Sequence, residues 1–222
     1  MNRGFFCDLD GTLADNMEIM FSVYQEFLRG FYLSPTPEEF ALLNGPPLPQ
    51  VVSVLKERHG LGGSLEGLVK TYQEILDASY MRAKPSPGAS EILEAAKRSG
   101  MFIAIVTSSS YQRTLAWLDR NGLESVIDLI VSGGDCEGKP SPEPYKMALA
   151  KLRCSAEQSI AVEDSLQGIQ SALSAQLRTF CYSSGPLRIA VPKTVSTITH
   201  FGELATFIPQ LADRRDAAAS NV

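Results

Sequence analysis

The stretch Phe5–Leu13 reads FFCDLDGTL. Its apolar start is typical of a buried parallel strand. Asp8 and Asp10 follow two residues apart, so their side chains would share one side if the strand stayed regular. Gly11 instead predicts the end of the strand, where the backbone can turn sharply and approach a ligand. Two acids at the carboxyl end of a buried strand indicate a site for a hard cation and a phosphate, whereas the alternative is an ordinary turn.

Composition and charge narrow the class of protein. The 222 residues are 44% hydrophobic and 20% charged, which describes a soluble globular protein with room for one α/β domain and a modest second one. The net charge of −5, without any Lys/Arg-rich run, gives no support to nucleic-acid binding. No apolar run approaches the length that spans a membrane. We therefore expect neither a nucleic acid nor a membrane as a partner.

Cysteine spacing and the start of the chain bear on the compartment. The four cysteines are scattered and form no CxxC pair, which favours a reducing environment. Residues 1–4 lead straight into the first predicted strand and leave no room for a signal peptide. The expected location is the cytoplasm.

The segment 16–83 carries helix and turn signals without a strand signal. One helix there is predicted to start at Thr36, with Pro37 in its first turn and Glu39 completing a capping box. We interpret the whole segment, residues 16–83, as a small, all-helical domain inserted after the first strand.

From residue 84 the pattern changes to short β-prone runs that alternate with helical segments, which predicts right-handed crossovers and a parallel sheet. The expected fold is therefore α/β, with a Rossmann-like parallel sheet and helices on both faces. Residues 1–15 and 84–222 would form this α/β core domain. The predicted strands are 102–106, 126–131, 160–162 and 179–182.

Polar signals follow three of the later strands. Thr107 and Ser108 lie at a strand-to-helix junction, where they could hold phosphate oxygens or simply cap the helix. Lys139 precedes another helix and could reach phosphate as a point charge, although taken alone a surface lysine is the better interpretation. Glu163 and Asp164 are natural Mg²⁺ ligands or supporting groups, unless they cap the next helix. Because open α/β sheets bind ligands at their carboxyl ends, the signals together predict one site.

The order Asp-x-Asp-Gly-Thr, Thr-Ser, Gly-Lys-Pro and Glu-Asp-Ser resembles the four motifs of the haloacid dehalogenase superfamily, over about residues 4–182. The helical insertion resembles the cap of the branch that contains β-phosphoglucomutase and phosphoglycolate phosphatase. The resemblance implies a Mg²⁺-dependent phosphatase that hydrolyses a small-molecule phosphate ester through an aspartyl-phosphate.

The resemblance also implies catalytic roles. Asp8 would be the nucleophile that takes the phosphoryl group. Asp10 would protonate the leaving oxygen and then, as a base, activate water. Thr107 and Lys139 would bind the oxygens of the transferring phosphoryl group, with help from the backbone of Ser108.

The same resemblance implies the metal ligands. Asp164, Asp8 and the carbonyl of Asp10 would bind Mg²⁺, while Glu163 would support the site or bind the ion directly. Asn16 follows the first motif at the predicted cap hinge and is the best-placed candidate for a substrate contact from the cap. The other polar candidates of the cap and hinge are Asn44, Lys56, Arg58, His59 and Lys84.

Two other functions stay open at this point. A sugar phosphomutase would use the same core, but mutases of the resembled branch carry a His and an Arg where this chain has Met20 and Leu48. A non-catalytic phospho-ligand-binding module could lack Asp8, Asp10 or Lys139, and all three are present. The substrate, whether of the phosphoglycolate or the sugar-phosphate type, and the choice between monomer and homodimer are not determined by the sequence.

Overall fold

The computed structural model describes residues 1–43, 45–183 and 189–208. Asn44 and the polar tail 212–222, which the sequence predicts to fray, lie outside those residues.

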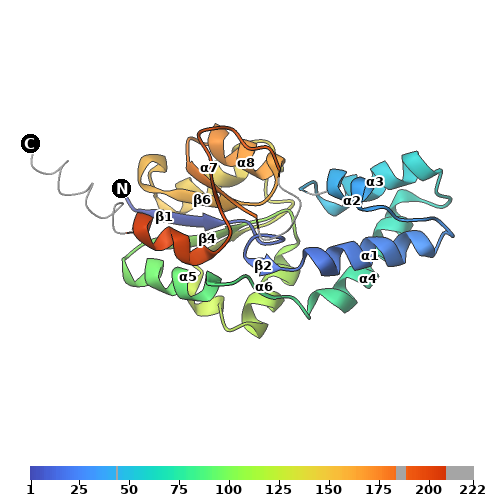
Figure 1. The fold of residues 1–222 in the computed structure, drawn as a ribbon, viewed down its shortest axis with the longest axis horizontal. Helices are drawn as coiled ribbons and strands as arrows, with labels where there is room; N and C mark the ends of the chain where they lie inside the picture. The colour runs from blue at the N-terminus through green and yellow to red at the C-terminus, as the bar shows by residue number, and fades with distance from the viewer. Residues whose placement is uncertain (44, 184–188, 209–222) are drawn as a thin grey trace, which may run out of the picture.

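Within the described part of the chain, six strands form one parallel sheet in the order β5-β4-β1-β6-β7-β8 (Figure 1). The first strand therefore lies at the centre, between the strands that carry the second and fourth motifs. The predicted α/β fold with a Rossmann-like sheet is confirmed. The strands are β1 (Gly4–Cys7), β4 (Phe102–Val106), β5 (Leu129–Val131), β6 (Ile160–Glu163), β7 (Arg178–Tyr182) and β8 (Ser196–Ile198).

Helices cover both faces of this sheet, with α5 and α6 on one side and α7 and α8 on the other (Figure 1). Alternation along β1 explains the two layers, because successive strand residues point to opposite faces. Phe5 and Cys7 belong to the hydrophobic cluster that contains Trp117, whereas Phe6 belongs to the cluster that contains Tyr145. These helices span Ala89–Arg98 (α5), Tyr111–Arg120 (α6), Glu143–Leu152 (α7) and Leu166–Ser174 (α8).

The sheet differs from the prediction at its two edges. The run 126–131 forms a strand only from Leu129, because a 3-10 helix, η1 (Glu124–Val126), takes up its beginning. The edge strand β8 was not predicted. Two of its three residues are exposed and polar, so it has no apolar run to reveal it. The other short helices of the core are η2 (Ala156–Gln158) and η3 (Phe201–Thr206).

The described residues of segment 16–83 contain helices and turns but no strand, as predicted. They lie at one end of the molecule, beside the sheet (Figure 1). None of the helices that the structure describes, here or in the core, combines the length and hydropathy needed to cross a lipid bilayer. The four helices are α1 (Met17–Arg29), α2 (Pro37–Leu42), α3 (Leu48–His59) and α4 (Leu65–Tyr80).

A short antiparallel ribbon connects the two parts of the chain. Strand β2 (Ala14–Asp15) pairs with β3 (Lys84–Pro85), which places the two crossings between sheet and helical segment side by side. The ribbon coincides with the predicted boundaries at residues 15/16 and 83/84. The division into a core and a cap remains our proposal.

The predicted capping box at α2 is only half formed. The Thr36 side chain accepts a hydrogen bond from the backbone N–H of Glu39, as expected. The Glu39 carboxylate does not bind the backbone N–H of Thr36. It instead binds three side chains: the hydroxyl of Tyr24, the guanidinium of Arg58 and the ring of His59. A tertiary cluster that joins α1, α2 and α3 has replaced the local contact.

Candidate active site

The central strands bring three of the sequence motifs to one edge of the sheet. Asp8 follows β1 and its backbone N–H donates to the carbonyl of Val162 in β6, 3.0 Å away. Thr107 follows β4 and donates in the same way to Val131 in β5, at 2.9 Å. The parallel register thus places side chains from distant motifs at neighbouring strand ends.

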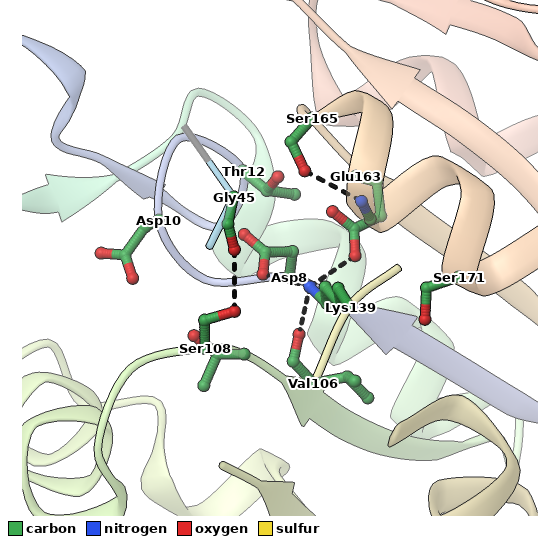
Figure 2. A network of polar contacts seen from close by, with 12 residues as sticks. Asp8, Asp10, Thr12, Gly45, Val106, Ser108, Lys139, Glu163, Ser165 and Ser171 are labelled. Atoms are coloured by element: carbon green, nitrogen blue, oxygen red, sulfur yellow. Dashed lines mark hydrogen bonds and ion pairs between the residues drawn. The ribbon is translucent and has the colours of Figure 1, made fainter. Parts of the chain in front are cut away.

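Lys139 is buried between two carboxylates (Figure 2). Its Nζ lies 2.5 Å from Asp8 Oδ1 and 2.5 Å from Glu163 Oε1, and it donates to the carbonyl of Val106 at 2.8 Å. Only 6% of Lys139 and 7% of Asp8 are exposed. The interpretation of Lys139 as a surface lysine, which its own motif favoured, is therefore wrong.

Burial and charge act against each other in this cluster. Burial raises the pKa of the Asp8 carboxyl above its ordinary value, and the nearby Lys139 ammonium opposes that rise. For Lys139, burial would lower the pKa, but the attraction of Asp8 and Glu163 outweighs it and raises the pKa. Lys139 therefore stays cationic at neutral pH and offsets two buried acids.

Glu163 is held from three sides. Its Oε1 accepts hydrogen bonds from Lys139 and from the hydroxyl of Tyr145. Its Oε2 is buried, makes no hydrogen bond to the described residues and faces Gly168, where a Cβ atom would lie 1.9 Å away. Gly168 in α8 thus provides the space that the Glu163 side chain fills.

Asp164 completes a cluster of acids with Asp8 and Glu163, in which one oxygen of each lies within 4.8 Å of the others. Carboxylate oxygens are the ligands that Mg²⁺ prefers, so this donor set fits a hard divalent cation. Gly11, at φ +77°, brings the backbone of the first motif close to Asp164, since a Cβ there would lie 2.3 Å from Oδ2. Ser165, rather than either acid, caps α8.

Asp10 points away from this acidic cluster (Figure 2). Strand β1 ends at Cys7, so the regular alternation that would put Asp8 and Asp10 on one side does not continue. Ser109 Oγ donates to Asp10 Oδ2 at 2.7 Å, and Asn16 Nδ2 donates to Asp10 Oδ1 at 2.6 Å. Two polar groups therefore orient this carboxylate.

Asn16 is buried and its amide is already engaged, since Oδ1 also accepts the backbone N–H of Gly11 at 2.9 Å. Ser109 was missed by the sequence reasoning, which singled out Thr107 and Ser108 in the same serine-rich run. The helix-capping role considered for that run belongs to Ser110. Ser108 Oγ donates to the carbonyl of Gly45, so it links the core to the helical segment.

A cavity lies over the site, between the sheet edge and the helical segment. Most residues of the predicted site line it: Asp8, Asp10, Thr107, Ser108, Lys139 and Asp164. Neither Asn16 nor Glu163 is among its described lining residues. The helical segment contributes a mostly apolar wall, which includes Met17, Met20, Phe40, Leu43, Pro46, Leu48, Val51, Tyr72 and Leu76.

The polar candidates from the cap lie elsewhere. Lys56 binds the carbonyls of Leu61 and Gly63, while Arg58 and His59 bind Glu39. They, and Lys84, are not among the described residues that line the cavity. Arg113 of α6 does line it, and no motif of the sequence indicated that residue.

Comparison with known proteins identifies the family. The family model described as haloacid dehalogenase-like hydrolase matches residues 6–182. The chain belongs to this family. The predicted resemblance to haloacid dehalogenase-like enzymes is thus confirmed, and so is the prediction of a hydrolase.

Individual relatives of the haloacid dehalogenase-like family cover most of the chain. The phosphorylated carbohydrates phosphatase of Thermotoga maritima is 30% identical over 170 residues, 76% of this chain and 79% of the relative. The 6-phosphogluconate phosphatase of Escherichia coli is 28% identical over 213 residues, 90% of this chain and 91% of the relative. The crystal structure of CbbY from Rhodobacter sphaeroides in complex with phosphate has a TM-score of 0.80 at 25% identity, covering 92% of this chain and 96% of that one.

Proposed function

We propose that this chain is a Mg²⁺-dependent phosphatase that hydrolyses a small phosphorylated metabolite through an aspartyl-phosphate on Asp8. The observation that carries the proposal is the contact of the buried Lys139 with Asp8 and Glu163 beneath the cavity. A buried ion pair is weak evidence for stability, because desolvation offsets much of its attraction. A cation next to a carboxylate that both line a cavity does suit the transfer of a negatively charged phosphoryl group.

In the proposed reaction, the Asp8 carboxylate forms a bond to phosphorus while the bond from phosphorus to the leaving oxygen breaks. Asp10 gives its proton to that oxygen, which departs as an alcohol. Asp10 then takes a proton from water as the water oxygen attacks the phosphorus. The bond to Asp8 breaks, inorganic phosphate is released, and Asp8 is again a carboxylate and Asp10 an acid.

The remaining groups bind and orient. Thr107 and Lys139 hold the phosphoryl oxygens, with help from the backbone of Ser108, whose hydroxyl already donates to Gly45. Asp8, the Asp10 carbonyl and Asp164 would hold Mg²⁺, which supplies positive charge against the phosphoryl oxygens.

Two residues receive refined roles in this proposal. We assign Glu163 a supporting role, because Lys139 and Tyr145 already engage its Oε1. We assign Asn16 the positioning of Asp10, in place of the substrate contact that its sequence position suggested. Ser109 acts with Asn16 on the other oxygen of Asp10.

A mutase is the second candidate, and the cavity argues against it. Met20 and Leu48, which stand where mutases of the resembled branch carry a His and an Arg, both line the cavity and offer it no charge. A non-catalytic binding module is a third candidate. Such a module does not require a nucleophile, an acid and a lysine in this arrangement, and all of these are present.

The substrate type that we propose is a small phosphate ester, of the phosphoglycolate or the sugar-phosphate type. Two relatives are named as phosphatases of phosphorylated carbohydrates and of 6-phosphogluconate, and these names support a small phosphate ester as the substrate. A cytoplasmic location and a monomeric or homodimeric state remain predictions.

The test is the release of phosphate from a panel of small phosphate esters, with and without Mg²⁺, next to an assay for isomerisation of glucose 1-phosphate. We expect Mg²⁺-dependent release that is concentrated on few esters. Isomerisation without net phosphate release would replace the phosphatase by a mutase. Folded protein that is silent in both assays would favour a binding module.

A further inference from the structure

Apart from the residues assigned to phosphoryl transfer and metal binding, one charged side chain is found among the described residues that line the cavity. Asp8, Asp10, Lys139 and Asp164 cluster where the phosphoryl group would bind, and the helical segment opposite them is mostly apolar. Arg113 is the exception. The part of a substrate that leaves with the ester oxygen would therefore meet apolar side chains and a single guanidinium.

Arg113 lines this cavity, and its guanidinium is held in place by two neighbours. Its Nε lies 2.9 Å and its Nη2 2.8 Å from the same oxygen of Asp77 in α4, and its carbon lies 5.7 Å from the centre of the Tyr80 ring. The Arg113 side chain is 8% exposed, whereas that of Asp77 is 53% exposed. A cation that lines the cavity is thus paired with an anion that faces water, where the attraction is screened.

The pairing leaves hydrogen-bonding capacity. A guanidinium has five N–H donors in a planar fork, and both contacts fall on one oxygen of Asp77. Arg113 therefore keeps donors for a second oxyanion, and such charge-assisted bonds are about twice as strong as neutral ones.

Whereas Arg113 favours an oxyanion, the apolar wall disfavours a polyol. Each hydroxyl group that leaves water without a new partner costs free energy, so a leaving group with many hydroxyls is disfavoured in this cavity. A short leaving group with an apolar body and one oxyanion would meet both the wall and Arg113 with suitable groups.

We propose that Arg113 binds an oxyanion on the leaving group, a carboxylate or a second phosphate, and so makes the enzyme selective for esters with an anionic leaving group. The proposal rests on the proposed phosphatase function and narrows its substrate class. The proposal assigns substrate selection to a residue of helix α6, which packs on the parallel sheet. From the sequence alone, we expected the selecting residues in the cap.

The experiment compares matched esters. The first pair is 2-phosphoglycolate and 2-phosphoglycolamide, in which a neutral amide group replaces the carboxylate at nearly equal shape. The second pair is propane-1,3-diyl bisphosphate and propyl phosphate, which lacks the second phosphate. We expect kcat/KM to favour the anionic member of at least one pair by about tenfold or more, which is the scale of one charge-assisted hydrogen bond. A preference in one pair alone identifies the oxyanion as carboxylate or phosphate. No preference in either pair overturns the proposal.

The variant Arg113→Gln separates selection from a structural role. We expect it to reduce the preference for the anionic ester from about tenfold or more towards 1, mainly through KM. Equal losses for both members of a pair, with the preference intact, would make Arg113 a structural link to α4 and overturn the proposal. The control is Arg98→Gln, which removes an exposed ion pair with Glu94. It should change neither the preference for the anionic ester nor KM.

Hydrolysis of p-nitrophenyl phosphate distinguishes the two levels of the argument. If wild-type protein hydrolyses this generic ester with Mg²⁺ but shows no preference within the pairs, the inference on Arg113 fails and the phosphatase stands. If folded protein hydrolyses none of the esters, the proposed function itself fails.

Discussion

Lys139 Nζ and Asp8 Oδ1 lie 2.5 Å apart, in a contact between two almost fully buried side chains that are 131 residues apart in the sequence. Asp8 directly follows the central strand β1, and Lys139 lies in the segment between β5 and helix α7. Glu163 shares the same ammonium. Folding therefore brings one cation to two acids at the floor of the cavity.

Lys139→Met should destabilise the protein by about 3 to 5 kcal/mol, because it leaves the carboxylates of Asp8 and Glu163 buried without their cation. Urea denaturation of wild type and variant measures the difference. The matched control is Lys146→Met on α7, which removes an exposed pair with Glu143 and should cost less than about 0.5 kcal/mol. Equal urea midpoints for the two variants would contradict the claim that Lys139→Met leaves buried carboxylates without a cation.

Asp8→Asn should abolish turnover, with a loss of about a thousandfold or more, because an amide cannot act as the nucleophile. The fold should remain, since asparagine has nearly the same size. Phosphate release and circular dichroism check the two statements. Normal turnover by the folded variant would eliminate the covalent mechanism.

Gly168→Ala should destabilise the protein by about 1 to 3 kcal/mol, since the new methyl group would meet Glu163 Oε2 at 1.9 Å. Displacement of Glu163 should also lower activity through Lys139. Gly62→Ala is the control, because no atom lies within 4 Å of a Cβ placed there. Thermal unfolding compares the two, and a Gly168 variant as stable as the Gly62 variant would show that the neighbourhood of Glu163 yields easily.

Mg²⁺ should raise the melting temperature of the wild type, and a chelator should reverse the effect, because a ligand that binds only the folded state stabilises it. At a hundredfold excess over Kd the gain is about 2.7 kcal/mol. Asp164→Asn should lose most of this response. Asp119→Asn, an exposed acid on α6, should keep it. A response that both variants retain would place the cation elsewhere.

Glu39 should make stability depend on acid pH. Burial would raise the pKa of its carboxyl, but hydrogen bonds from Tyr24 and His59 outweigh burial and lower it. A lowered pKa means that the stabilisation is present above the unfolded pKa of about 4.3 and is lost as the pH falls through the folded value. The stability difference between wild type and Glu39→Gln should therefore shrink between neutral pH and about pH 3. Glu38→Gln, an exposed neighbour on α2, should show no such trend in denaturation at several pH values.

Local features were predicted well from the sequence. Strand β4 has the bounds of the predicted run 102–106, because periodicity and chain-breaking residues act within a few positions. The capping box at α2 shows where such reasoning ends. Thr36 caps the helix as expected, yet Glu39 is drawn to His59 of α3, a partner that local patterns do not reveal.

The candidate site shows the same division. The motif residues Asp8, Thr107, Lys139 and Asp164 were all identified from the sequence, and the cavity is lined by each of them. Arg113 was missed, since it stands on a helix without a motif.

The sequence by itself determined the α/β fold and the family, because strand and helix periods and the order of four short motifs are written in neighbouring residues. Only the tertiary structure decided the contacts of Lys139 with Asp8 and Glu163, and of Ser109 with Asp10. The two members of each pair belong to different motifs. Their distances depend on the register of parallel strands and on the packing of helices over them, which no local pattern contains.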